Sequence, residues 1–226
     1  MFIIIDGPSG SGKGTLIEGL VSRLTEKRIP VHTFSEEKAD SKRHEILEAR
    51  EKGRKRGGTG DKEMAEVLVK HRRQMYFLNV EEPIGDGRVV VADRGESATL
   101  AYQTVKGELS MEQIWMMHRK AHIRTPDLLV ITTCRAEVSL SREEADKAQT
   151  GSVRREMESG TGLSGKISSE PGADNAEKLE KRGAIHRQYD AAIDFLREKG
   201  VKVLRVDTEG MTPEEEVSRI FSHLES

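Results

Sequence analysis

A short apolar run, Phe2–Ile5, leads directly into a segment crowded with glycine and ending in a lysine. The segment reads Asp6-Gly-Pro-Ser-Gly-Ser-Gly-Lys-Gly-Thr15, and apolar residues with helical spacing follow it from Leu16 to Leu24. A strand that turns sharply into a helix needs residues that tolerate unusual backbone angles, and glycine is such a residue. The N–H groups of such a turn, the positive end of the helix and a lysine together bind phosphate. The segment therefore predicts a nucleotide-phosphate site within an α/β fold.

Short apolar runs recur along the chain and alternate with longer stretches of helical periodicity. They lie at Phe2–Ile5, Val31–Phe34, Val89–Ala92, Leu128–Thr132 and Val201–Val206. This alternation predicts a five-stranded parallel sheet flanked by helices, with ligands at the carboxyl ends of the strands. Near the end of the chain, Thr212-Pro213-Glu214-Glu215 has the pattern of a helix capping box with proline in the first turn.

Length and charge set limits on the function. The 226 residues are enough for one substantial core, and a single domain over residues 1–226 is predicted. Lys and Arg number 37 against 39 Asp and Glu, so the net charge of −2 gives no reason to expect a nucleic-acid or membrane partner. The single cysteine, Cys134, and the absence of any long apolar run or signal-peptide pattern favour a cytoplasmic protein.

An acidic residue and an arginine, Asp93 and Arg94, stand at the end of the third apolar run. At the carboxyl edge of a parallel sheet they would face the glycine-rich loop. A carboxylate there can hold a metal-bound water, and a guanidinium can grip a phosphate through two parallel hydrogen bonds.

The segment from Asp93 to Gln103 resembles thymidylate kinase, whose motif runs from the Asp-Arg pair through a serine to Ala-Tyr-Gln. Here Ala101-Tyr102-Gln103 has the matching spacing. Arg72 with Gln74 resembles that family's acceptor helix, and Pro126-Asp127-Leu128-Leu129-Val130 resembles its fourth strand. The glycine loop itself is most similar to that of cytidylate kinase. The resemblance implies the P-loop kinase fold and an ATP-dependent nucleoside monophosphate kinase that uses Mg²⁺.

The resemblance assigns roles to individual residues. The residues expected to bind the donor nucleotide are Gly7, Ser9, Gly10, Ser11, Gly12, Lys13, Gly14, Thr15 and Asp207. Those expected to bind the acceptor are Ser9, Leu68, Arg72, Asp93, Arg94, Tyr102 and Gln103. Thr15 and Asp93 are expected at the metal. The expected catalytic residues are Lys13, Arg94, Arg142, Arg154 and Arg155.

Two segments interrupt the regular alternation: residues 36–63, rich in charge and glycine, and residues 141–176, which combine charge with Gly, Ser and Thr. In a P-loop kinase the first is expected to bind the acceptor and the second to close as a lid that excludes water. The transferring phosphoryl group gathers negative charge, and the loop contains no arginine. This resembles the thymidylate kinase subtype that supplies the arginine from the lid, which implies that Arg154 or Arg155 supplies it here.

Several positions depart from the thymidylate kinase pattern. Ser9 replaces an acidic residue, Leu68 replaces the aromatic ring that stacks on thymine, and Gly95 replaces Tyr or Phe. The Thr-Arg-Glu-Pro-Gly segment is replaced by Ser35-Glu36-Glu37-Lys38. The leading prediction is phosphorylation of dTMP to dTDP.

Two alternatives stay open. One is a kinase of another small acceptor, either CMP or dCMP or a deoxynucleoside, for which Glu36 or Glu37 would act as the base. The other is a nucleotide-dependent regulatory protein with the same fold. The small-molecule nucleotide is the expected partner, and the sequence leaves a homodimer open.

Overall fold

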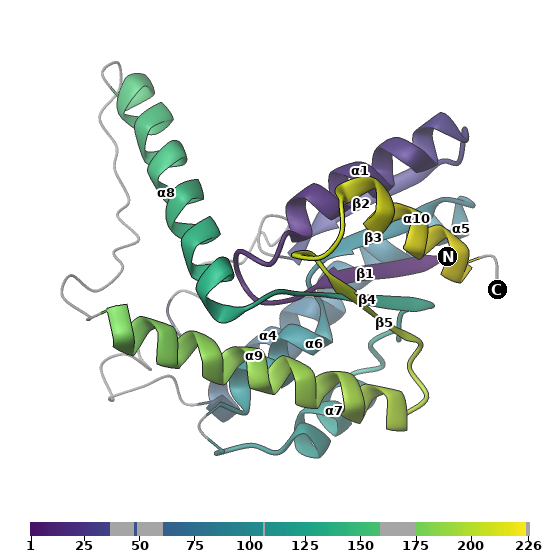
Figure 1. The fold of residues 1–226 in the computed structure, drawn as a ribbon. Coiled ribbons are helices and arrows are strands. Elements are labelled where there is room, and N and C mark those ends of the chain that lie inside the picture. Colours follow the sequence, from purple (N-terminus) through teal and green to yellow (C-terminus); the bar gives the residue numbers. More distant parts are fainter. Residues whose placement is uncertain (37–47, 49–60, 106, 159–174, 225–226) are drawn as a thin grey trace.

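The computed structural model describes residues 1–36, 48, 61–105, 107–158 and 175–224. Five strands form one sheet, in the order β2-β3-β1-β4-β5, and every neighbouring pair is parallel (Figure 1). The strands are β1 (Phe2–Asp6), β2 (Val31–Ser35), β3 (Val89–Asp93), β4 (Leu128–Thr133) and β5 (Val203–Asp207). The prediction of a five-stranded parallel sheet is confirmed.

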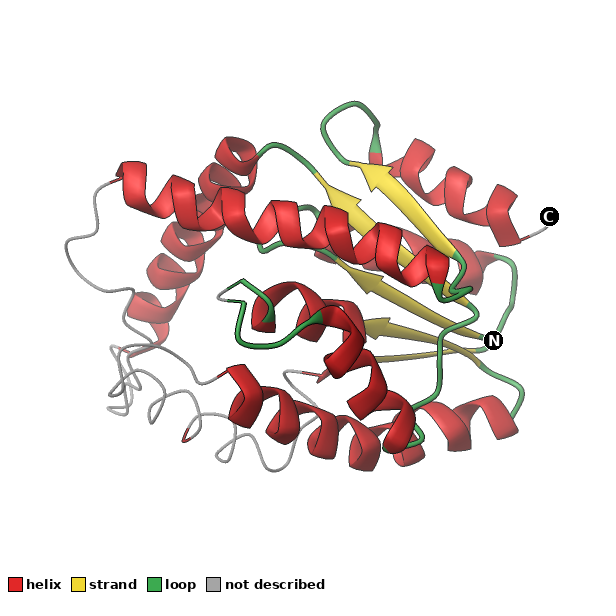
Figure 2. Cartoon of the chain, turned by 90° about the horizontal axis from the view of Figure 1, so that it is seen from below, coloured by secondary structure: helices red, strands yellow, loops and turns green. Residues whose placement is uncertain are grey.

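Helices cover both faces of this sheet. They are α1 (Lys13–Glu26), α4 (Asp61–Tyr76), the π-helical turn η1 (Phe77–Glu81), α5 (Glu82–Gly85), α6 (Glu96–Gln103), α7 (Met111–Lys120), α8 (Ala136–Glu158), α9 (Asn175–Glu198) and α10 (Pro213–Leu224). Figure 1 shows α1 and α10 on one face, and Figure 2 shows the opposite face, which α4, α6, α7 and α9 cover.

Strand β1 contributes side chains to two separate hydrophobic cores, one on each face of the sheet. Ile3 and Ile5 pack with Leu16 and Leu20 of α1, whereas Phe2 and Ile4 pack with apolar residues of α4, α6 and α9. Successive side chains of a strand point to opposite faces, so an uninterrupted apolar strand can only be buried on both sides. This explains why β1 contains no polar residue before Asp6.

The predicted capping box at the start of α10 is confirmed. The Glu215 N–H donates to Thr212 Oγ1 at 3.3 Å, and Glu215 Oε2 accepts from the Thr212 N–H at 2.7 Å. Each side chain thus satisfies a backbone group that the first helical turn leaves unpaired.

The segment predicted to break the regular pattern from residue 141 is helical up to Glu158, so that part of the prediction is wrong. The stretch 141–158 is rich in Glu, Arg, Lys and Ala, which favour helix even where few residues are apolar. Figure 1 shows α8 projecting away from the sheet. Residues 159–174 lie outside the described residues, as do 37–47 and 49–60 of the other predicted segment.

A buried ion pair joins α6 to α7. Glu96 is 3% exposed, and its Oε2 accepts a hydrogen bond from Arg119 Nη2 at 2.6 Å. The Arg119 guanidinium also lies 4.2 Å from the centre of the Trp115 ring. Burial raises the pKa of Glu96, and Arg119 acts against that rise.

We predict that Arg119→Ala destabilises the fold by about 2–3 kcal/mol near pH 8, because Glu96 then stays buried without its cation. Loss of the arginine raises the pKa of Glu96 further. A carboxyl with a raised pKa binds more protons folded than unfolded, so the destabilisation should shrink toward about pH 5. Urea unfolding at the two pH values measures both effects.

Arg124→Ala is the control, because Arg124 pairs with Glu81 at the surface at 3.0 Å. Its loss should cost less than about 1 kcal/mol at either pH. Equal losses for Arg119→Ala at both pH values would mean that the charge of Glu96 is not the cause.

Candidate active site

The glycine-rich loop follows β1 and ends where α1 begins. The φ angles of Gly7, Gly10 and Gly12 are 147°, 75° and 87°, values that residues with a side chain rarely adopt. A Cβ atom at Gly10 would lie 2.0 Å from the Ser139 carbonyl oxygen, and one at Gly7 would lie 2.5 Å from that of Thr132. The loop therefore needs glycine both for its backbone angles and for its close approach to β4 and α8.

Lys13, the first residue of α1, folds back over this loop. Its Nζ donates to the Gly7 carbonyl at 3.0 Å and to the Pro8 carbonyl at 2.7 Å. Burial, reinforced by repulsion from Arg94, lowers the pKa of Lys13 from 10.5 to about 8. The ammonium group thus lies where burial and Arg94 make its charge unfavourable and where a bound anion would stabilise it.

The carboxylate of Asp6 lies fully buried beneath the loop. Oδ1 accepts from the Gly7 N–H at 2.7 Å and from the Tyr189 hydroxyl at 2.9 Å, and Oδ2 accepts from Ser97 Oγ at 2.6 Å. Sequence reasoning did not include Asp6, Ser97 or Tyr189 among the site residues. An acidic residue at the end of a buried apolar strand was the one signal available for Asp6.

Arg94 lies beside the loop, as its position after β3 led us to expect. Its Nη1 is 3.7 Å from Asp6 Oδ1, and its Nη2 donates to Ser9 Oγ at 3.4 Å. The guanidinium lies 5.8 Å from the centre of the Tyr102 ring. Arg94, Ser9 and Tyr102 are therefore neighbours. Asp93 precedes them at the end of β3, half-buried and near enough to Lys13 to attract its charge.

Arg72 on α4 is 2% exposed and bound to protein groups on every side. Its Nε and Nη2 donate to the two carboxylate oxygens of Glu36, the Nη2 bond being 2.7 Å long. Nη2 also donates to the Gly95 carbonyl at 2.9 Å, and Nη1 donates to Thr99 Oγ1 at 3.2 Å and to His118 Nε2. In this conformation Arg72 reaches an acceptor only by exchanging one of these partners.

His118 and Gly95 fix the surroundings of Arg72. Burial, reinforced by Arg72, lowers the pKa of His118 to about 3. The ring is neutral, with Nδ1 donating to the Ile114 carbonyl at 2.8 Å. A Cβ atom at Gly95 would lie 2.7 Å from Ile4 Cδ1 in the core, so a side chain at this position would require Ile4 to shift.

Arg142, in the second turn of α8, binds the turn after β5. Its Nη1 donates to Thr208 Oγ1 at 2.9 Å and its Nη2 to the Thr208 carbonyl at 3.1 Å. Thr208 Oγ1 in turn donates to the Ser11 carbonyl of the loop at 3.1 Å. Asp207, next to it, is exposed and accepts from the Glu209 N–H at 3.0 Å.

Arg182 on α9 also reaches the loop, and sequence reasoning missed it. Its Nη1 donates to the Ser9 carbonyl at 3.0 Å, and its Nη2 pairs with Glu143 of α8. Nothing in the charged sequence around Arg182 distinguishes it from its neighbours.

The other residues predicted for the site lie at scattered positions. Gly14 and Thr15 are exposed in the first turn of α1, and Leu68 is half-buried on α4. Gln103 is 8% exposed, and within the described residues no group donates to its Oε1. Arg154 and Arg155 lie in the outer turns of α8, and their side chains are outside the described part of the structure.

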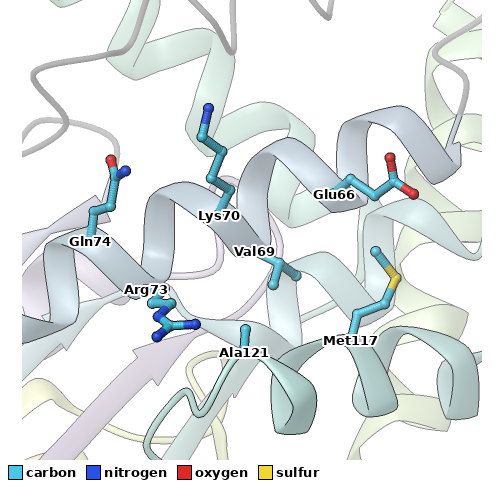
Figure 3. A pocket seen from close by; sticks show the side chains of 7 residues that line it. All are labelled: Glu66, Val69, Lys70, Arg73, Gln74, Met117 and Ala121. Carbon is cyan, nitrogen blue, oxygen red and sulfur yellow. The ribbon is translucent and has the colours of Figure 1, made fainter.

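A pocket of about 510 Å³ lies elsewhere, between α4 and α7 (Figure 3). Its lining consists of Glu66, Val69, Lys70, Arg73, Gln74, Met117 and Ala121. None of the predicted site residues is among them. Arg73 lines this pocket, whereas its neighbour Arg72 is buried against Glu36.

The loop fits a nucleotide phosphate chain, because its glycine backbone leads into the positive end of α1 and because burial and the nearby Arg94 disfavour the charge of Lys13. A magnesium ion in such a site keeps several waters and takes only one or two protein carboxylates. Asp93 can supply such a carboxylate. Across the described residues no group of three or more His, Cys, Asp and Glu side chains could hold a metal by itself.

Comparisons with known proteins agree with this geometry. The chain is 27% identical over 148 residues to the thymidylate kinase of Leuconostoc citreum, covering 65% of this chain and 69% of the relative. It is 31% identical to that of Pseudomonas putida and 32% to that of Ectopseudomonas mendocina, each over 64% of this chain and 69% of the relative. None of the described helices is long and apolar enough to cross a membrane.

The sequence model of the thymidylate kinase family matches residues 5–161, which include the glycine-rich loop, Arg72 and the segment from Asp93 to Gln103. The chain therefore belongs to the thymidylate kinase family.

Proposed function

We propose that the protein transfers the γ-phosphate of ATP to dTMP and so forms dTDP. The observation that carries this proposal is the convergence of Lys13 and Arg94 on one glycine-rich loop, in a chain of the thymidylate kinase family. The two cations belong to different elements, α1 and the end of β3. One can therefore bind the donor phosphates while the other binds the acceptor phosphate.

The donor side would consist of the loop from Gly7 to Thr15. Its backbone and Lys13 would hold the phosphates of ATP, and Asp93 with Thr15 would hold Mg²⁺ through its waters. Bound Mg²⁺ neutralises charge on the phosphates. Asp207, next to Thr208 beside the loop, would contact the nucleoside end of the donor. Arg142, which binds Thr208, would help to neutralise the charge of the phosphates.

The acceptor side would consist of Arg94, Tyr102, Gln103, Arg72 and Leu68. Arg94 would bind the monophosphate in a two-pronged contact. The buried Oε1 of Gln103 fits an N–H group of a pyrimidine ring, because within the described residues it has no donor. Leu68 would offer apolar contact to the base.

Transfer would be in line and without a covalent protein intermediate. The protein would position the two nucleotides and neutralise the charge that develops on the transferring group. Residues 36–63 would bind the acceptor and residues 141–176 would form the lid, with Arg154 or Arg155 contributing to the charge. A homodimer and a cytoplasmic location also remain predictions from the sequence.

One observation favours a second candidate, a kinase whose acceptor is a hydroxyl group. Glu36 is 12% exposed, follows β2 at the carboxyl edge of the sheet and is fixed bidentately by Arg72. A carboxylate fixed at this edge can accept the proton of a hydroxyl acceptor, a role that a monophosphate acceptor does not require.

A panel of acceptors separates the two candidates. We expect dTMP to have the highest kcat/KM with ATP and Mg²⁺ among dTMP, dCMP, CMP, thymidine and deoxycytidine. Coupled detection of ADP measures each rate. Preference for either nucleoside would overturn the proposed function in favour of the hydroxyl acceptor, and no turnover of any compound would favour a regulatory role.

Substitution of Arg94 tests the acceptor phosphate. Arg94→Lys keeps the charge but loses the planar fork, so kcat/KM for dTMP should fall about ten- to hundredfold. The affinity for ATP should change by less than about twofold, because Lys13 and the loop hold the donor. Arg73→Lys, an exposed neighbour of Arg72, should change neither. If ATP binding is lost while the use of dTMP is unchanged, the assignments of the donor and acceptor sites must be exchanged.

The lowered pKa of Lys13, about 8, predicts a proton linkage. Phosphates favour the charged amine and raise its pKa, so ATP binding near pH 8 should take up about half a proton, and near pH 6 almost none from this group. ATP affinity should therefore fall as the pH rises through 8. Calorimetry in buffers of different ionisation enthalpy measures the uptake. Lys13→Arg stays charged throughout, so an equal uptake in that variant would refute the assignment.

A further inference from the structure

Ser9 of the loop is contacted by two arginines from different parts of the chain. Arg182 of α9 donates to its carbonyl at 3.0 Å, and Arg94 donates to its hydroxyl at 3.4 Å. With Lys13, which binds the neighbouring Gly7 and Pro8 carbonyls, three cationic side chains lie around one short loop. Asp6, which lies 3.7 Å from Arg94, and Asp93 offset part of this positive charge, and an anion bound at the loop would offset more of it.

Part of the balancing charge for Arg182 comes from Glu143 of α8, which pairs with its Nη2. Both side chains are largely buried, at 13% and 22% exposed. Within the described residues, the contacts of Arg182 use one N–H of each terminal nitrogen, and each of these nitrogens carries a second. The guanidinium can therefore bind a phosphate oxygen while it keeps its contact with Ser9.

The charge of Arg182 is near enough to act on Lys13, the residue expected to bind the phosphates. Together with burial and Arg94, it lowers the pKa of Lys13. Because Arg182 repels the charged Lys13, it would attract the phosphate that Lys13 binds. Arg154 and Arg155, by contrast, lie in the outer turns of α8, which projects away from the sheet (Figure 1).

We propose that Arg182 is a catalytic arginine that contacts the phosphate chain of the donor nucleotide, and that Glu143 holds its guanidinium beside the loop until the donor binds. The inference rests on the proposed function, and assigns to α9 a charge-neutralising role that the sequence assigned to the lid. Transfer of its hydrogen bonds from a carboxylate to phosphate makes and breaks no covalent bond.

Titration with the non-hydrolysable ATP analogue AMP-PNP and Mg²⁺ tests this contact without turnover. Arg182→Ala should weaken binding about ten- to hundredfold, and Arg182→Lys should weaken it less. Binding of adenosine alone should not change. With dTMP as acceptor, Arg182→Ala should also lower kcat. Thermal melting of each variant shows whether it folds, and if Arg182→Ala does not fold, Arg182→Lys takes its place.

Lys178→Ala is the matched control. Lys178 lies one turn before Arg182 on α9 and pairs with Glu144 of α8 at 3.8 Å, so it also joins the two helices but at the surface. Its loss should leave AMP-PNP affinity unchanged. If Lys178→Ala weakens binding as much as Arg182→Ala, the role of Arg182 is to join α8 to α9 and the proposal fails.

Glu143→Gln should have the opposite effect, because it removes a carboxylate that competes with phosphate for Arg182. AMP-PNP affinity should be unchanged or higher, and any gain should vanish in the Arg182→Ala background. Weaker binding by Glu143→Gln, or unchanged binding by a folded Arg182→Ala, would overturn the proposal. Failure of the wild type to use dTMP would instead overturn the proposed function, since these titrations contain no acceptor.

Discussion

The buried carboxylate of Asp6 is the point at which the separate parts of the site are joined. It accepts hydrogen bonds from the loop backbone at Gly7, from Ser97 of α6 and from Tyr189 of α9. A buried carboxylate is costly unless donors satisfy it, so this packing is favourable only when the three donors are in place together. The loop, α6 and α9 are therefore fixed relative to one another by the requirements of one side chain.

Near this carboxylate, two cationic side chains lie close together, which is electrostatically unfavourable until an anionic substrate binds. Lys13 and Arg94 lie close enough, in surroundings dry enough, that the pKa of the lysine falls to about 8. Functional sites commonly contain such perturbed groups, because the interactions that make a charge unfavourable alone make it effective toward an anion. The proposed roles of Lys13, Arg94 and Arg182 all depend on this concentration of positive charge at the loop.

The proposed acceptor side is organised differently, because the charge of Arg72 is already neutralised by a protein carboxylate. Arg72 pairs with Glu36, which follows β2, and with the neutral ring of His118. Removal of any partner would leave a charge or a polar group buried without compensation. In the proposed function, recognition of the acceptor would depend on whether Arg72 keeps Glu36 or exchanges it. Glu36 is one of the positions at which this chain departs from the family pattern.

Local sequence by itself determined the five strands, the glycine loop and the capping box of α10, because each depends on preferences encoded within a few neighbouring residues. The same reasoning failed from residue 141, where scarcity of apolar residues concealed a helix. Only the tertiary structure decided that Tyr189 meets Asp6 across 183 residues and that Arg182 meets Ser9 across 173. Such contacts depend on how whole helices pack against the sheet, which no stretch of sequence around either partner encodes.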